Sequence, residues 1–232
     1  MNMMRATSKN RRRLLKPGLS FFLLISLGVL TPVMADSRII TLPDPNLKGD
    51  VSLEETISKR RSIRSYHARE LDLAAISQLL WSAQGVTAVK SGRHLRAAPS
   101  AGALYPMEVY VAKKDGIFRY IPATHSLEIT RTTDQRQALA AAAYGQSYVA
   151  QAPAVFILCA VYARVTGKYG KRGVRYTDME AGHIAENIHL QAVALGLGSV
   201  PVGAFQADEV RRLLALPDDR EPIYIVPVGF AR

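Results

Sequence analysis

The chain has 232 residues, 48% of them hydrophobic, and a formal net charge of +11 at pH 7. This length and composition can bury one substantial core, so a single catalytic-sized domain is expected. Six basic residues precede the first acidic residue, Asp36, and the remainder carries +5. That remainder lacks a basic stripe interleaved with aromatic residues, so a nucleic-acid-binding protein is not expected. Cys159 is the single cysteine, which excludes an intramolecular disulfide, and its apolar neighbours indicate a buried strand.

Residues 1–35 have the layout of a cleavable export signal. A basic segment precedes an apolar run from Leu19 to Leu30, and Val33-Met34-Ala35 comes directly before Asp36. The apolar run is shorter than the ~20 residues that span a bilayer, which favours a cleaved signal. The alternative is an uncleaved membrane anchor. Arg11-Arg12-Arg13-Leu14-Leu15-Lys16 resembles the twin-arginine pattern, and an ordinary basic Sec leader is the other option. We therefore expect an exported, periplasmic protein that meets the membrane only through this segment, during export.

A Pro-containing linker, residues 36–51, leads to a cluster of arginines. Ser52-Leu53-Glu54-Glu55 is a capping box and predicts a short helix to about Lys59. Arg60-Arg61-Ser62-Ile63-Arg64 follows directly. Alternate side chains of an extended segment share a face, so Arg60, Ser62 and Arg64 could converge on one phosphate while Ile63 points into the core. The residues alone also fit a solvated basic turn.

A second helix and a turn of small residues come next. Asp72 is the predicted N-cap, and Gly85 ends a helix whose apolar residues recur at helical spacing. Ser91 to Ala98 is polar and basic. The small residues Pro99-Ser100-Ala101-Gly102 would let the backbone lie against a flat ring, although an ordinary turn before a strand is the alternative.

The rest of the chain alternates strands and helices and predicts an α+β fold. We expect strands at Met107–Ala112, Ile117–Ile121, His125–Thr130, Ala154–Val161 and Pro222–Phe230, and helices at Asp134–Tyr144, Tyr176–Leu195 and Glu209–Leu214. His183, Glu186 and His189 on the long helix are spaced like possible metal ligands. The two histidines are six residues apart, on different helix faces, so no metal site is expected.

Three blocks carry a resemblance to a known family. They are Arg60-Arg61-Ser62-Ile63-Arg64 after a first helix, Pro99-Ser100-Ala101-Gly102 within the larger block Ala98–Glu108, and Gly196–Phe205. Together they make the chain similar, from about Ser52 to Arg232, to the nitroreductase-like FMN flavoproteins and their SagB/ThcOx-type branch. The resemblance implies residues 52–232 as an FMN-binding domain, a central mixed but mainly antiparallel sheet flanked by helices, and a homodimer with the flavin in a cleft at the subunit interface.

The resemblance also implies which residues hold the cofactor. Some relatives have a glutamate where this chain has Val202-Gly203-Ala204, which leaves one contact to the ring edge open. Arg232 matches the position at which the family places a cation near the FMN phosphate. The alternative is that Arg232 belongs to a frayed terminus without a role in binding. The implied FMN-contacting residues are Arg60, Arg61, Ser62, Arg64, Pro99, Ser100, Ala101, Gly102, Asn187, Pro201, Val202, Gly203, Ala204 and Arg232.

The implied activity is an FMN-dependent oxidoreductase that transfers hydride with ping-pong turnover, on a small-molecule or peptide substrate. No catalytic acid or base stands out, as expected where the cofactor carries the chemistry. NAD(P)H could be a transient donor, although an exported enzyme would meet another donor or run as a dehydrogenase, like the azoline dehydrogenases of this branch. The candidate proton donors are Lys168, Tyr169, Arg175 and Tyr176. The alternative is that these residues belong to a surface loop with no catalytic role. The alternatives are an exported, non-enzymatic protein binding another phosphate-bearing or peptide ligand, and a polycationic surface binder.

Overall fold

The computed structural model describes residues 38–232, so the predicted export signal lies outside the described residues. The strands are β1 (Ile39–Thr41), β2 (Val86–Lys90), β3 (Arg93–Arg96), β4 (Met107–Lys113), β5 (Gly116–Ile121), β6 (Ser126–Arg131), β7 (Ala154–Ala160), β8 (Gly198–Ser199) and β9 (Glu221–Gly229). The helices are α1 (Leu53–Lys59), α2 (Leu73–Gln84), α3 (Arg136–Ala142), α4 (Ser147–Gln151), α5 (Ala163–Tyr169), α6 (Arg172–Ala194) and α7 (Ala207–Leu214), with a 3-10 turn, η1 (Ala101–Ala103).

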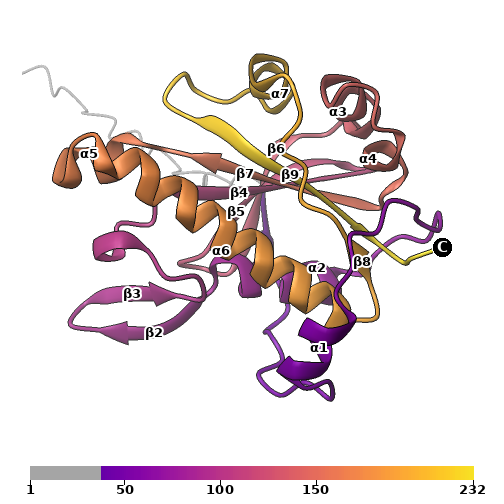
Figure 1. Cartoon of the computed structure of the whole chain (residues 1–232), viewed down its shortest axis with the longest axis horizontal. Helices are drawn as coiled ribbons and strands as arrows, with labels where there is room; N and C mark the ends of the chain where they lie inside the picture. The colour runs from indigo at the N-terminus through magenta and orange to yellow at the C-terminus, as the bar shows by residue number, and fades with distance from the viewer. Residues whose placement is uncertain (1–37) are drawn as a thin grey trace, which may run out of the picture. The chain divides into compact units, whose positions relative to one another are not determined.

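Seven strands form one sheet in the order β1-β6-β5-β4-β7-β9-β8, and β2 and β3 form a separate hairpin. Each neighbouring pair in the large sheet is antiparallel. The long helix α6 crosses one face of the sheet together with α2, and α3, α4 and α7 lie on the other (Figure 1). Within residues 38–232, no helix combines the length and the apolar character that a membrane crossing requires.

Strand β7 is the centre of the core because both of its faces are covered. All seven of its residues are buried. Successive side chains of a strand point to opposite faces. Phe156 and Leu158 accordingly pack into the cluster beneath α2 and α6, while Ile157 and Cys159 pack into the cluster beneath α3, α4 and α7. Burial also raises the pKa of the Cys159 thiol, as expected of a core residue. The predicted α+β fold with a mainly antiparallel sheet flanked by helices is confirmed.

The predicted caps of the first two helices are present. The Ser52 hydroxyl accepts a hydrogen bond of 3.1 Å from the Glu55 amide at the start of α1. The Asp72 carboxylate accepts one of 2.8 Å from the Ala75 amide, and Gly85 follows the last residue of α2. Each cap satisfies an amide that the helix itself leaves unpaired. Helix α1 therefore ends directly before Arg60, as predicted.

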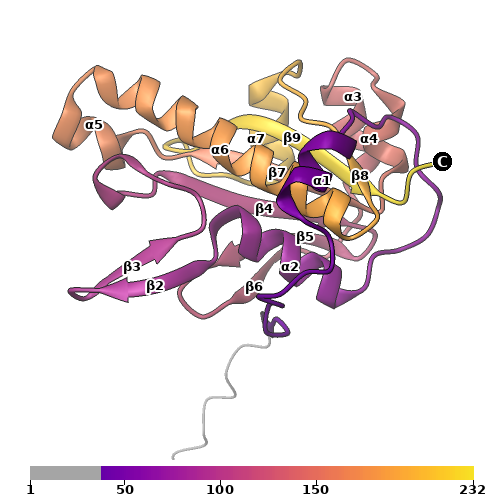
Figure 2. The same cartoon turned by 60° about the horizontal axis from the view of Figure 1, so that its bottom comes forward.

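Several structured segments were not predicted. Residues 36–51, predicted as a linker, contain β1, which pairs with β6 at the edge of the sheet. The polar stretch before Ala98 is β3 of the β2–β3 hairpin, which projects from the body of the protein (Figure 2). The loop predicted before the long helix is α5, and α6 begins at Arg172, four residues before Tyr176.

The predicted helix from Asp134 to Tyr144 is shorter. Helix α3 ends at Ala142, because Tyr144 and Gly145 both adopt positive φ angles, +55° and +77°. A separate short helix, α4, then begins at Ser147. Residues in the left-handed region interrupt the α-helical hydrogen-bond pattern, and tyrosine, unlike glycine, gives little sequence signal for it.

Candidate functional site

Residues 60–67 lie between β8 and the last residues of the chain. The Ile63 amide donates to the Ser199 carbonyl (3.0 Å), and the His67 amide donates to the Phe230 carbonyl (2.9 Å). The Arg232 amide in turn donates to the Ser65 carbonyl (3.1 Å). These contacts bring the arginine cluster together with β8 and with Arg232.

Side chains of this segment alternate as predicted. Ser62 and Arg64 are exposed, whereas Ile63 packs against Gly198 at the start of β8. A Cβ at Gly198 would lie 2.7 Å from Ile63 Cβ, so only glycine admits this approach. The buried Tyr66 hydroxyl donates to the Ile63 carbonyl at 2.6 Å, and desolvation by burial raises the pKa of the phenol. The alternation leaves a hydroxyl and a guanidinium on one open face.

The guanidinium of Arg60 contacts the imidazole of a buried histidine, His189. Its Nη1 lies 3.1 Å from His189 Nε2, and His189 Nδ1 lies 2.6 Å from the hydroxyl of Ser199. Arginine can only donate, so Nε2 is the acceptor and Nδ1 carries the proton toward Ser199. Desolvation, and secondarily the positive charge of Arg60, lower the pKa of His189 to about 4. His189 is thus neutral at pH 7 and fixes one edge of the Arg60 guanidinium.

This role of His189 was not predicted, because its spacing from His183 and Glu186 was interpreted only in terms of metal ligands. His183 and Glu186, the other two candidates, are exposed, whereas His189 is buried. Within residues 38–232, no group of three His, Cys, Asp or Glu side chains is arranged to hold a metal ion. The one signal available in the sequence was a polar residue on the buried face of an otherwise amphipathic helix.

Arg61 points away from this group. Its guanidinium donates to the carbonyls of Ser58 and Arg60, at 3.0 and 2.6 Å. Carbonyls at the end of a helix lack partners within the helix, and a cation there also complements the helix dipole. Arg61 therefore caps α1, and the structure gives it no contact with Ser62, Arg64 or Arg232.

The segment Pro201-Val202-Gly203-Ala204 follows β8, the strand that contacts Ile63. Val202 exchanges two backbone hydrogen bonds with Ile225 of β9, 2.8 and 3.0 Å, which fixes the segment on the sheet. Gly203 and Ala204 are exposed, and a Cβ at Gly203 would meet its nearest atom only at 3.7 Å. A flat ligand that carries a phosphate is suited by two kinds of group present here: guanidiniums and a hydroxyl in the arginine cluster, and a fixed backbone with small exposed residues at Gly203 and Ala204. The residues present therefore fit FMN.

Pro99-Ser100-Ala101-Gly102 lies at the other end of α6. Ser100 hydrogen-bonds Glu180, and the Ser100 hydroxyl accepts from the Tyr105 amide at 2.9 Å. Glu180 and His189 are nine residues apart, which is about 13 Å along one helix. The turn contains positive φ angles at Gly102, Ala103 and Tyr105, and a Cβ at Gly102 would lie 2.8 Å from the Tyr169 hydroxyl. Strained backbone of this kind is common at functional sites.

Asn187 lies on α6, two residues before His189. Its amide donates to the Ser82 carbonyl of α2 at 2.9 Å. It lines a cleft of about 990 Å³ between α2, α6 and residues 44–53, with Trp81 and Phe230 also in the wall. A cleft of this volume is at the upper end of typical ligand sites. Along α6, Asn187 is therefore close in rise to His189, whereas Pro99–Gly102 lies farther along this helix.

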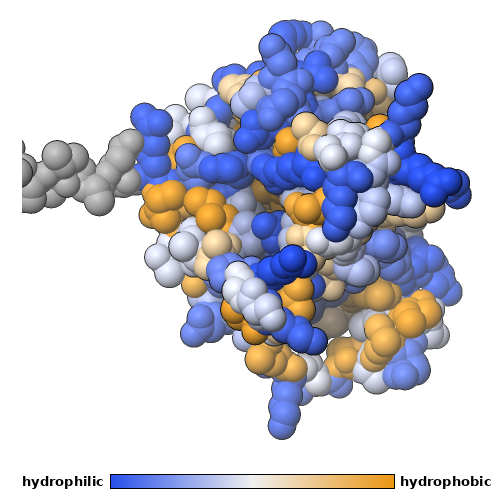
Figure 3. Space-filling view, turned by 90° about the vertical axis from the view of Figure 1, so that its left-hand side faces the viewer, coloured by the Kyte–Doolittle hydropathy of each residue, from blue (hydrophilic) through white to orange (hydrophobic). Residues whose placement is uncertain are grey.

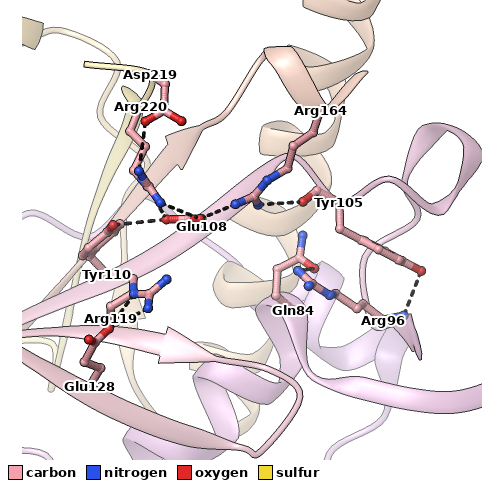
Figure 4. Close-up of polar contacts among 10 residues, drawn as sticks. All are labelled: Gln84, Arg96, Tyr105, Glu108, Tyr110, Arg119, Glu128, Arg164, Asp219 and Arg220. Carbon is pink, nitrogen blue, oxygen red and sulfur yellow. Dashed lines mark hydrogen bonds and ion pairs between the residues drawn. The ribbon is translucent and has the colours of Figure 1, made fainter. Parts of the chain in front are cut away.

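Glu108 is the last residue of the Ala98–Glu108 block, and its carboxylate lies at the centre of a network of ion pairs (Figure 4). Arg164 of α5 and Arg220 approach its carboxylate at 2.5 and 2.7 Å, and Tyr110 donates to it at 3.2 Å. Burial raises the pKa of Glu108, but hydrogen bonds from Arg220 and Arg164 outweigh burial, so the pKa is lowered. Arg164 also donates to the Tyr105 carbonyl, so the network supports the strained turn.

The chain is similar to known proteins over most of its length. Residues 57–230 match the model of the nitroreductase family. The chain is 42% identical over 202 residues to a Methanocaldococcus jannaschii protein named "Putative nitroreductase", covering 84% of this chain and 98% of that protein. It is 26% identical over 162 residues to the microcin B17-processing protein McbC of Escherichia coli, covering 64% of this chain and 59% of that protein.

A solved structure shows the same fold. The crystal structure of a nitroreductase-like protein from Ralstonia eutropha superposes with a TM-score of 0.76 at 34% identity, covering 84% of this chain and 90% of that one. The family match spans most of the chain and includes the arginine cluster from Arg60, the segment after β8 and strand β9. The chain belongs to the nitroreductase family.

Proposed function

We propose that this protein is an exported, FMN-dependent oxidoreductase of the SagB/ThcOx-type branch. The observation that carries the proposal is that Ser62 and Arg64 share one open face, with Arg232 bonded to Ser65 and Arg60 held by His189, in a chain of the nitroreductase family. When bound, FMN would supply hydride transfer, and the protein would supply binding, orientation and exclusion of water. The electron donor and the electron acceptor would bind in turn at the same site, which would give ping-pong turnover.

The phosphate would be held at the arginine cluster. Arg60 and Arg64 offer charge-assisted hydrogen bonds, Ser62 adds a neutral donor, and Arg232 is brought alongside by its amide contact with Ser65. His189 leaves the remaining guanidinium nitrogens of Arg60 free to face the ligand, because only Nη1 is engaged by the ring. Arg61, which caps α1, would contribute to the site only through the position of that helix.

The site would be completed by a second copy of the chain. Pro99–Gly102 lies about 13 Å along α6 from the arginine cluster, on the basis of the helical rise. A homodimer in which α6 contributes to the interface would allow the turn of one subunit to approach the cofactor held by the other. Two-fold symmetry would then form two identical sites.

The substrate side of the site would lie at η1 and α5. Lys168 and Tyr169 both approach Gly102, since a Cβ there would lie 3.1 Å from Lys168 Nζ and 2.8 Å from the Tyr169 hydroxyl. An ammonium and a phenol at the turn are suited to donate or accept a proton during oxidation of a substrate such as an azoline. McbC, a relative, is named for processing microcin B17, which favours a peptide substrate. Export would separate the enzyme from cytoplasmic NAD(P)H, so a dehydrogenase direction is favoured over NAD(P)H oxidation.

The test is the cofactor itself. Protein comprising Asp36–Arg232, which forms one compact unit, should be yellow and show the absorbance bands of oxidised flavin. Heating should release FMN, identified by chromatography, and the native protein should elute as a dimer. Colourless protein that takes up no added FMN would refute the proposal and leave a non-enzymatic binding protein as the better interpretation. Flavin-loaded protein reduced rapidly by NAD(P)H would argue for a cytoplasmic reductase instead.

A further inference from the structure

Glu180 is a buried carboxylate in the N-terminal half of α6. It is 2% exposed, and Gln84, the last residue of α2, is fully buried beside it. The Gln84 side-chain amide donates to Glu180 Oε1 at 3.0 Å. A buried carboxylate is unfavourable unless hydrogen bonds compensate for the lost water, and desolvation by burial raises the pKa of Glu180. Neither the arginine cluster nor the ion pairs of Glu108 use this group, so its burial needs another explanation.

The contacts of Glu180 belong to a closed set that joins α6, α2, β3 and the turn at η1. Gln84 Oε1 accepts from Arg96 Nη1 at 3.4 Å, and the Arg96 amide donates to the Tyr105 hydroxyl at 3.0 Å (Figure 4). The Tyr105 amide donates to the Ser100 hydroxyl oxygen at 2.9 Å, and Ser100 hydrogen-bonds Glu180. Because the Ser100 oxygen accepts from Tyr105, its proton is available to the Glu180 carboxylate. We call these five residues the Glu180 network.

The turn that this network encloses has an unfavourable backbone conformation. Gly102, Ala103 and Tyr105 have φ angles of +63°, +53° and +48°. Residues other than glycine rarely adopt this region, and they remain there only where surrounding contacts determine the conformation. The network supplies such contacts at both ends of the turn, through the Ser100 side chain and through the amide and hydroxyl of Tyr105. The buried carboxylate and the strained turn are therefore parts of one arrangement.

The carboxylate of the network does not depend on a free surface. Figure 3 faces the end of the protein that carries α5 and the β2–β3 hairpin, and hydrophilic residues cover much of this end. The turn meets α5 here, since a Cβ at Gly102 would lie 2.8 Å from the Tyr169 hydroxyl. Glu180 and Gln84, in contrast, are buried within a single chain. A second copy of the chain packed against α6 or against the turn would leave the network intact.

We infer that Glu180 is a positioning residue for the flavin site: through Ser100 it fixes the backbone of the turn, and with it the direction of the turn's amides. This inference rests on the proposed function, in which the turn of one subunit approaches the FMN held by the other. Glu180 itself touches neither cofactor nor substrate. Amides that donate to a flavin stabilise its electron-rich reduced form more than its oxidised form, so a fixed turn raises the reduction potential.

The first measurement is amide hydrogen exchange by NMR, on the protein as purified. The amides of Ala103 and Leu104 donate to the carbonyls of Ser100 and Ala101 at 3.1 and 3.4 Å, so their exchange reports on the turn. Glu180→Gln has one oxygen where the carboxylate has two, and it should speed this exchange about tenfold. Ser100→Ala removes the same link without added bulk and should have a similar effect. The double variant should exchange no more than about twofold faster than either single variant, because both changes break one link.

The matched control is Thr177→Val on the same helix. It removes a buried hydroxyl that donates to the Gly173 carbonyl at 2.9 Å, so it deletes one buried hydrogen bond outside the Glu180 network. Exchange at Ala103 and Leu104 should change less than about twofold in this variant.

The second measurement is the midpoint potential of bound FMN, by spectroelectrochemical titration. Glu180→Gln should lower it, because the loosened amides stabilise the reduced flavin less, whereas loss of a negative charge alone would raise it. Thr177→Val should leave it unchanged. Control-like exchange in Glu180→Gln, additive effects in the double variant, or a potential that is raised or unchanged overturns the inference. Flavin-loaded protein with control-like exchange refutes the role of Glu180 alone, and colourless protein that takes up no FMN refutes the proposed function, whatever its exchange.

Discussion

The guanidinium of Arg60 and the imidazole of His189 meet at 3.1 Å, although 129 positions separate them in the chain. The contact joins the residue after α1 to the buried face of α6. Because the ring is neutral at pH 7, it can accept from Arg60 without repelling it. This pair connects the predicted phosphate site to the core of the protein. Protonation of His189 should therefore affect stability.

Acid should destabilise the protein through His189. Its pKa is about 4 in the folded protein and about 6.5 when unfolded, so between these values the unfolded state binds the extra proton. Stability should therefore fall as the pH drops from about 6.5 to 4, by at most about 3 kcal/mol from this group. His189→Gln can accept from Arg60 and donate to Ser199 but does not titrate. Urea unfolding of both proteins across this range should show a flatter profile for the variant, and parallel profiles would contradict the assignment.

Arg60→Ala and Arg64→Ala should each weaken FMN binding. Loss of one charge-assisted hydrogen bond costs on the order of 1.5 to 3 kcal/mol, about one to two decades in affinity. Ser65→Ala and Arg61→Ala are the controls, since Ser65 contributes its carbonyl and the Arg61 guanidinium is directed to α1. Flavin titration by fluorescence quenching measures all four. Equal affinities would place the phosphate elsewhere.

Gly198→Ala should destabilise the site and the fold together. The new methyl would lie 2.7 Å from Ile63 Cβ, too close without a shift of residues 62–64, and overpacking of this kind costs about 1 to 3 kcal/mol. Gly182→Ala on α6 is the matched control, because nothing lies within 4 Å of its Cβ and alanine favours a helix by about 1 kcal/mol. Thermal melts should move in opposite directions. A Gly198 variant with wild-type stability and flavin content would show that the close approach is dispensable.

Glu108→Gln should cost about 3 kcal/mol, because it leaves Arg164 and Arg220 around a neutral amide in a mostly buried position. The lowered pKa of Glu108 means that its contribution is complete above the ordinary carboxyl pKa and is lost as the pH falls through the depressed value. The variant should therefore lose less stability in acid than wild type. Glu128→Gln breaks the half-exposed pair with Arg119 and should cost less than about 1 kcal/mol. Chemical denaturation at neutral and acid pH distinguishes the two.

Export should depend on the leader sequence. Arg11→Lys/Arg12→Lys keeps the charge, so a Sec-type leader would still work, whereas a twin-arginine signal would fail and leave folded, flavin-loaded precursor in the cell. Fractionation with N-terminal sequencing identifies each form, and the mature protein is expected to begin near Asp36. Full-length protein found only in the cytoplasm would refute both routes.

The sequence predicted those elements whose signals are local. Ser52 and Asp72 mark the helix starts, and the continuous apolar run Ala154–Ala160 marks a strand covered on both faces. The β2–β3 hairpin gave no such signal because none of its strand residues is buried and Val89 is exposed. Strand β1 has only three residues and depends on its pairing with β6.

The residues of the candidate site could be proposed from the sequence, but their side-chain directions, partners and distances from one another could not. The alternation of Ser62, Ile63 and Arg64 follows from backbone geometry alone. The direction of Arg61 depends on unpaired carbonyls of α1, and the partner of Arg60 depends on how α6 packs below it. The separation of Pro99–Gly102 from Arg60 is set by the length of α6, which no short motif encodes.

The backbone contacts of residues 230–232 bear on how the protein should be tagged for purification. Tyr66 bridges Ala231, and the Arg232 amide is bonded to Ser65, so a peptide fused after Arg232 would emerge beside Ser62 and Arg64. Such a fusion would crowd the arginine cluster and lower cofactor occupancy during expression. Strand β1 lies at the opposite edge of the sheet from β8, so an affinity tag placed upstream of β1 would emerge away from the cluster.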